Sequence, residues 1–232
     1  MKMTVEQLAD SLSGGFTLPH LRELFLPAPD LTMTPEKVSA FEALSVVSQQ
    51  PTLANSVSYD LPYPKHEFLT YLLQYHPVLL HGSHRTDIQR LDPRAQTDYG
   101  GNPISAVFAS GDGIWPMFFA LIESQQFIGS MRNGCFVTMQ NQRYYFFSVN
   151  AIWLAKKLWS PGAIYILPKD GFRQSDTNGI RFDEWINESP VRPLMKLAIE
   201  PQDFPFLSQV AGHDEEESIF ESWLRYKERI SA

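Results

Sequence analysis

The residues best suited to chemistry are a histidine with two small neighbours and a late glutamate. The tripeptide His81-Gly-Ser83 ends an apolar run, and Glu184 stands much later, in Phe182-Asp-Glu-Trp-Ile186. A carboxylate beside a ribose hydroxyl can stabilise an oxocarbenium-like state, as in glycoside cleavage, and a positioned aromatic ring can hold the leaving group. These residue types, in this order, predict cleavage of the bond between ribose and nicotinamide in a dinucleotide.

A third fragment lies between these two. Ile104-Ser-Ala-Val-Phe-Ala-Ser110 reads as a strand of small residues that runs into an aromatic-rich helix. No glycine-rich dinucleotide fingerprint follows any predicted strand, and the phosphate-cradling loop of nucleotide hydrolases is missing. If a dinucleotide binds, it therefore does so by another route.

Apolar runs and turn residues predict the elements that position these fragments. A helix is expected over 66–75, and further helices over 112–127 and 150–158. Strands are expected over 78–82, 104–110, 135–139, 143–149, 162–168, 180–187 and 192–200. Strands dominate the second half with few helices between them. This order favours an α+β fold with a split, mixed and mostly antiparallel sheet.

The chain divides by composition into two parts. Residues 1–64 read as short helices punctuated by prolines, and we expect them to form a helical accessory lobe that supplies no chemistry. Residues 65–232 are expected to form the α+β domain, which includes a carboxyl-terminal helix over 214–230. That helix has acidic residues at its start, basic residues near its end and one apolar stripe, in keeping with the helix dipole.

Composition excludes several classes of protein. The 232 residues are 44% hydrophobic and 13% aromatic, which is enough apolar material for a packed core. With a formal net charge of −7 and no dense basic run, a nucleic-acid surface has little electrostatic support. Cys135 is the single cysteine and is expected to be a buried thiol, and no Cys/His zinc spacing exists. The chain shows no signal core or membrane-spanning stretch, so a cytoplasmic protein without a membrane partner is expected.

At the three fragments the sequence resembles the ADP-ribosyltransferase superfamily, in its His-Tyr-Glu branch of diphtheria-toxin-like and poly(ADP-ribose) polymerase-like enzymes. Leu79-Leu-His-Gly-Ser83 resembles the first-strand motif of that branch, and Ala106-Val-Phe-Ala-Ser110 resembles its second motif, usually Ile-Tyr-Phe-Ala. Phe182-Asp-Glu-Trp-Ile186 resembles the strand that carries the catalytic glutamate, usually Asn-Glu-Tyr-Ile. The resemblance covers about 78–200 and leaves the amino-terminal part unexplained.

The resemblance implies a role for each matched residue. Gly82 would bind the nicotinamide carboxamide through its backbone, His81 would bond the adenosine-side ribose, and Ser83 would lie beside the amide. Glu184 would be the catalytic carboxylate, with Glu188 as the competing candidate. Phe118 would stack on the nicotinamide, unless its neighbour Phe119 does so, and Phe108 belongs either to the pocket wall or to the core. NAD is the implied co-substrate, without a metal.

The sequence also departs from the family pattern. Val107 stands where the second motif has its tyrosine, Phe118 lacks a hydroxyl, and Asp183 precedes Glu184 where asparagine is common. The expected function is a mono-ADP-ribosyltransferase or NAD glycohydrolase whose acceptor is a protein, a nucleic acid, a small molecule or water. The alternative is an inactive NAD- or ADP-ribose-binding or interaction module of the same fold. A relative acting on RNA phosphates is disfavoured by the acidic balance.

Overall fold

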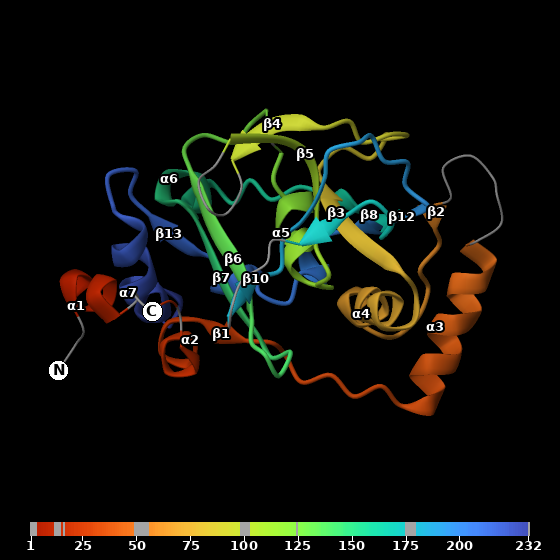
Figure 1. The fold of residues 1–232 in the computed structure, drawn as a ribbon, viewed down its shortest axis with the longest axis horizontal. Helices are drawn as coiled ribbons and strands as arrows, with labels where there is room; N and C mark the ends of the chain where they lie inside the picture. Colours follow the sequence, from red (N-terminus) through yellow and green to blue (C-terminus); the bar gives the residue numbers. More distant parts are fainter. Residues whose placement is uncertain are drawn as a thin grey trace.

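The computed structural model describes residues 4–11, 15, 17–48, 56–97, 103–123, 125–174 and 180–231. Helices stand at both ends of the molecule and the β-sheets lie between them (Figure 1). The helices are α1 (Val5–Ser11), α2 (Leu18–Leu24), α3 (Pro35–Ser48), α4 (Lys65–Tyr75), α5 (Trp115–Ala120), α6 (Ala151–Lys156) and α7 (Ile219–Ile230), with 3-10 turns η1 (Pro201–Asp203) and η2 (Leu207–Gln209). The strands are β1 (Leu26–Pro27), β2 (Ser56–Val57), β3 (Val78–Ser83), β4 (Arg94–Thr97), β5 (Pro103–Ala109), β6 (Met131–Val137), β7 (Arg143–Asn150), β8 (Gly162–Pro168), β9 (Arg173–Gln174), β10 (Arg181–Phe182), β11 (Trp185–Asn187), β12 (Met195–Ile199) and β13 (Ala211–His213).

The strands form three mixed or antiparallel sheets. The first has the order β1-β7-β6-β10, with β13 parallel to β7. The second has the order β4-β5-β11-β9 and is antiparallel throughout. The third has the order β2-β12-β8-β3, in which β2 and β12 are parallel. The α+β class with mostly antiparallel pairing, predicted from the sequence, is confirmed.

Strands β6 and β7 form the hairpin predicted around residues 140–142. Their register runs from Met131 opposite Val149 to Val137 opposite Arg143. Asn141 takes the left-handed conformation that the turn requires, with φ of 61°. The backbone N–H of Gln142 donates to the Thr138 hydroxyl at 3.0 Å, which closes the loop. Because these signals are local, the sequence alone could predict this turn.

Five predicted elements are shorter than the sequence suggested, including α6 and β12, which lie within the ranges 150–158 and 192–200. The helix expected over 112–127 is reduced to α5, because the chain after Leu121 pairs with the segment around Trp159. The carboxyl-terminal helix begins at Ile219 instead of 214, because Ser218 caps it with a hydrogen bond to the N–H of Glu221. The strand expected over 180–187 is divided into β10 and β11 at residues 183 and 184.

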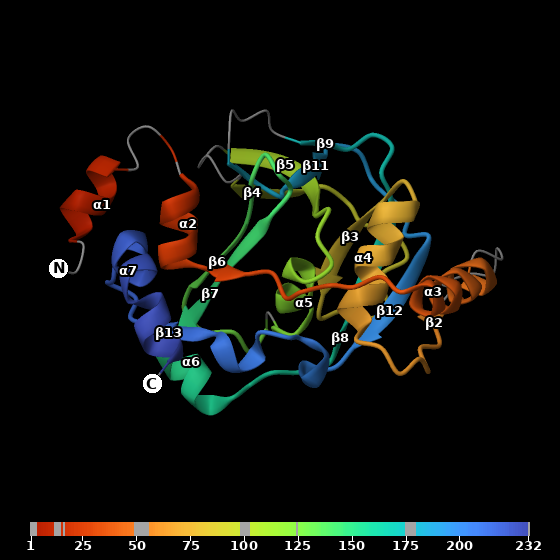
Figure 2. The ribbon, with the colours of Figure 1, turned by 90° about the horizontal axis from the view of Figure 1, so that it is seen from below.

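The elements before residue 65 are spread over the molecule. Helices α1 and α2 pack against α7 at one end, whereas α3 packs against α4 at the other (Figure 2). Strand β1 joins the first sheet and β2 joins the third. Phe25 stacks on Phe136, and Phe41 packs on Phe68. The described residues before Lys65 therefore share their hydrophobic cores with the rest of the chain.

Two glycines allow α5 to lie directly on the third sheet. A Cβ on Gly82 would stand 1.8 Å from the carbonyl oxygen of Pro116, and a Cβ on Gly162 would stand 1.9 Å from that of Ala120. No side chain fits at either position without moving α5 away from β3 and β8. The close approach fixes α5 beside the strand that carries His81.

Candidate functional site

Strand β5 lies between β3, which carries His81, and β11, which begins directly after Glu184. β3 contacts the end of β5 through the bridge between Leu80 and Ser110. β11 pairs with β5, with Trp185 opposite Ala109 and Ile186 opposite Phe108. His81 and Glu184 are thus brought to opposite sides of one strand, although they are far apart in the sequence.

Strands β3 and β5 are joined at one pair of residues and separate beyond it, at a gap that we call the split. The N–H groups of Leu80 and Ser110 each donate to the other's carbonyl oxygen, at 2.9 Å in both directions. Within the described residues this is the single bridge between β3 and β5. Backbone groups alternate along a strand, so the N–H and C=O of Gly82 point to the same edge as those of Leu80. Gly82 therefore presents a donor and an acceptor at the split.

His81 reaches across this split. Its Nδ1 lies 2.7 Å from the carbonyl oxygen of Phe108. A carbonyl oxygen only accepts, so Nδ1 carries the hydrogen. Burial lowers the pKa of His81, more than the hydrogen bond to Phe108 raises it. The ring is therefore neutral at neutral pH, and its Nε2 is an acceptor suited to a hydroxyl group.

The residues on both sides of Glu184 are held by hydrogen bonds. Glu184 itself is half-buried. The Asp183 carboxylate, 3% exposed, accepts from the Ser110 hydroxyl at 3.1 Å and from the Trp185 indole at 3.3 Å. The Gln174 amide donates to it at 3.4 Å. Burial and the nearby charge of Asp112 raise the pKa of Asp183.

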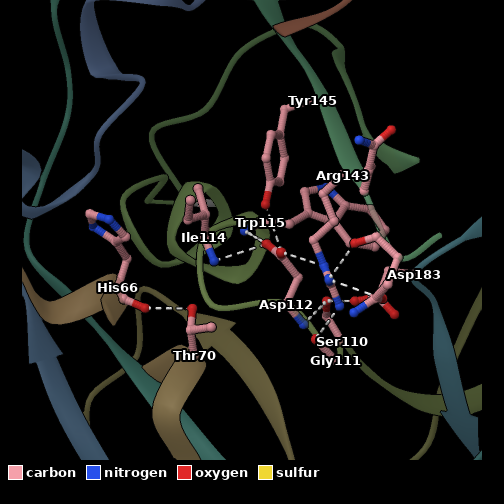
Figure 3. Close-up of polar contacts among 12 residues, drawn as sticks. His66, Thr70, Ser110, Gly111, Asp112, Ile114, Trp115, Arg143, Tyr145 and Asp183 are labelled. Carbon is pink, nitrogen blue, oxygen red and sulfur yellow. Dashed lines mark hydrogen bonds and ion pairs between the residues drawn. The ribbon is translucent and has the colours of Figure 1, made fainter. Parts of the chain in front are cut away.

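A buried ion pair stands next to this aspartate (Figure 3). Asp112 is 3% exposed, and its Oδ2 lies 3.0 Å from Nε of Arg143 and accepts from the Tyr145 hydroxyl at 2.7 Å. Its Oδ1 accepts from the backbone N–H groups of Ile114 at 2.9 Å and Trp115 at 2.6 Å. These contacts satisfy the whole carboxylate, so the pair fixes the start of α5 against β7.

A cavity of about 690 Å³ opens in front of this ion pair. Its walls come from the segment after β1, one face of α4, the turn before α5, and the β6–β7 hairpin. Among its polar lining residues are Asp30, His66, Thr70, Gln74, Asn141 and Arg143. Burial lowers the pKa of His66, whose Nδ1 is buried without a hydrogen-bond partner. Because Asp112 and Arg143 neutralise each other, the cavity has a polar back wall of little net charge.

The structure places the remaining predicted residues as follows. The Ser83 hydroxyl accepts from the N–H of Arg85 at 3.2 Å, and Phe108 is half-buried. Phe118 is 0% exposed, its ring 5.1 Å from that of Phe147, so it packs in the core. Phe119 is half-buried and is the more accessible ring of α5. In this conformation a ligand can reach Phe119 more readily than Phe118.

The chain matches none of the known protein-family models, curated proteins or solved structures with which it was compared. Within the described ranges, no group of three or more His, Cys, Asp or Glu side chains is arranged to hold a metal ion. In the same part of the chain, no helix is both long and apolar enough to cross a membrane.

The sequence does not single out three polar residues near the split. It predicts a helix at Asp112 and a strand at Arg143 and Tyr145, with no partner for any of them. One signal was available, since Ser110-Gly-Asp112 interrupts an otherwise apolar stretch with two polar side chains. A polar break of this kind within a buried segment indicates side chains that must find partners elsewhere in the fold.

Proposed function

We propose that this protein is an NAD-dependent mono-ADP-ribosyltransferase or NAD glycohydrolase. The proposal depends on one observation above all. Strands β3 and β5 separate immediately after the Leu80–Ser110 bridge, and the backbone of Gly82 and the ring of His81 lie at the split. A primary carboxamide has one acceptor and one donor group, which is what the N–H and C=O of a single residue can bind.

Each site residue has a chemical role in this proposal. The Gly82 backbone binds the carboxamide of nicotinamide, and Nε2 of neutral His81 accepts a hydrogen bond from a ribose hydroxyl. The Glu184 carboxylate stabilises positive charge that develops on the ribose as the bond from C1′ to the nicotinamide nitrogen breaks. The electron pair of that bond neutralises the cationic nitrogen, so nicotinamide leaves without a proton donor. The acceptor or water then attacks C1′, and the proton that it loses passes to the Glu184 carboxylate.

A second candidate is a module that binds NAD or ADP-ribose without turnover. Two observations favour it, namely the complete burial of Phe118 and the presence of Val107, also buried, at the position of the family tyrosine. A site without a stacking ring would bind the dinucleotide yet hold the leaving nicotinamide poorly.

Two measurements on the wild-type protein separate these functions. Calorimetry with NAD measures binding, and chromatography after incubation with NAD measures released nicotinamide. Binding of NAD together with nicotinamide release supports the enzyme. Binding without release supports the binding module, if release is absent both in water alone and with a range of protein and nucleic-acid acceptors. Absence of binding contradicts both.

A further inference from the structure

We infer that Ser110 is a positioning residue for the proposed reaction, because it holds both halves of the site in place. The inference rests on the proposed function and deepens it. Ser110 does not touch the substrate in this account, and it acts through Leu80 and Asp183. These two residues immediately precede His81 and Glu184 in the sequence.

The backbone of Ser110 fixes the strand of His81. Its N–H and C=O make the two 2.9 Å hydrogen bonds with Leu80 that form the bridge between β3 and β5. The split begins with the next residue of β3. Ser110 therefore determines where the strands separate and from which point the His81 ring reaches to Phe108.

The side chain of Ser110 fixes the segment of Glu184. Its hydroxyl donates to Oδ2 of Asp183 at 3.1 Å and accepts from the N–H of Asp112 at 3.1 Å. Ser110 is 4% exposed and Asp183 is 3% exposed, so water does not compete with this bond. Figure 3 shows the hydroxyl between Asp183 and the turn that leads to Asp112.

Glu184 lies between the ends of two backbone ladders. β10 ends at Phe182 and β11 begins at Trp185, so Asp183 and Glu184 lie in the gap between the two strands. On one side of Glu184 the backbone of Trp185 pairs with Ala109. On the other side the backbone N–H of Asp183 bonds to Cys135, while its carboxylate is held by Ser110, Trp185 and Gln174. Of these three residues, Ser110 is the one whose backbone also bonds to the strand of His81.

The test compares Ser110→Ala with Ser148→Ala as a matched control. Ser148 on β7 of the first sheet is also buried, and its hydroxyl lies 3.2 Å from the carbonyl oxygen of Ala211 and 2.7 Å from Nδ1 of His213. Both variants lose one buried hydroxyl, so similar decreases in Tm are expected. We expect kcat for nicotinamide release to fall roughly 10- to 100-fold in Ser110→Ala alone, because a displacement near 1 Å is enough for such a loss. The Kd for NAD should change little.

A double-mutant comparison tests the route through Asp183. If Ser110 acts through this carboxylate, Ser110→Ala should lower kcat little further in an Asp183→Ala background. Ser110→Cys keeps the size of the side chain and weakens the donor, so it should give an intermediate kcat and serves if Ser110→Ala does not fold.

The possible outcomes are distinct. One outcome is that the wild-type protein releases nicotinamide but kcat is equal in Ser110→Ala and Ser148→Ala, or equal in Ser110→Cys and the wild-type protein. That outcome overturns the positioning role and leaves the proposed function standing. A loss confined to Kd overturns it as well. Failure of the wild-type protein to release nicotinamide overturns the proposed function and this inference together.

Discussion

The hydroxyl of Tyr145 donates a 2.7 Å hydrogen bond to the carboxylate of Asp112, where both side chains are almost completely buried. The two residues belong to β7 and to the turn before α5, so the bond ties the first sheet to the helix that covers the third. Arg143 shares the same carboxylate oxygen. Burial and the charge of Asp112 raise the pKa of Tyr145 well above its ordinary value, so the phenol stays protonated.

Tyr145→Phe should lower the free energy of unfolding by about 1.5–3 kcal/mol, the usual contribution of a hydrogen bond to a charged partner. Tyr165→Phe is the matched control, because Tyr165 is equally buried but its hydroxyl bonds to the backbone of Arg85 and Ile88. We expect a loss of about 0.5–1.5 kcal/mol there for each of these two neutral hydrogen bonds. Urea unfolding measures both, and a loss below about 1.5 kcal/mol in Tyr145→Phe would contradict a strong hydrogen bond to the Asp112 carboxylate.

Glu184→Gln should keep the fold and much of the NAD affinity while lowering the rate of nicotinamide release by about 100- to 1,000-fold. The amide keeps the shape of the carboxylate and removes its charge. Glu188→Gln is the matched control, since Glu188 is exposed and bonded to Arg173 at 2.7 Å. It should release nicotinamide at nearly the wild-type rate. The reverse pattern would assign the catalytic carboxylate to Glu188.

Gly162→Ala should destabilise the protein by about 3 kcal/mol or more, because the new Cβ would overlap the backbone of Ala120 and overpack the interface of α5 and β8. In Gly212→Ala the nearest atoms, in Ala151, stand 3.2 Å away, so a loss under about 1 kcal/mol is expected. Thermal melts of the two variants provide the comparison. A similar Tm for both would show that α5 is not packed backbone to backbone on the sheet.

The stability of the protein should depend on the ionisation of Asp183. Its folded-state pKa is raised above the ordinary value of 3.8, first by burial and then by Asp112. The folded state therefore binds a proton that the unfolded state has released, and the unfolding free energy decreases as pH rises from about 3.8 through the folded pKa. Arg143 opposes the shift, and the hydrogen bonds from Ser110 and Trp185 do so too.

Asp183→Asn removes this ionisation. The free energy of unfolding of the variant, compared with that of the wild-type protein, should therefore increase as pH rises above 3.8. Urea titrations of both proteins at a series of pH values measure the difference. A difference that stays constant with pH, or that changes in the opposite direction, would show that the pKa of Asp183 is not raised in the folded protein.

Local patterns in the sequence determined many of the elements. The apolar run of β8, the β6–β7 hairpin around Asn141 and the helix α4 were predicted close to their observed bounds. Periodicity and turn chemistry are properties of neighbouring residues, so they can be read without a partner. The motifs around His81 and Glu184 were found in the same way.

Only the tertiary structure decided which polar residues meet. Ser110 and Asp183 are 73 positions apart, and Asp112 and Tyr145 are 33 apart, so no local spacing links either pair. Their partnership follows from burial, since a carboxylate removed from water needs donors from whichever strands pass nearby. The length of α5 was likewise determined by contacts with distant residues, whereas the start of α7 is set by the local cap at Ser218. The sequence thus named the residues of the proposed site, whereas the fold determined how they are held.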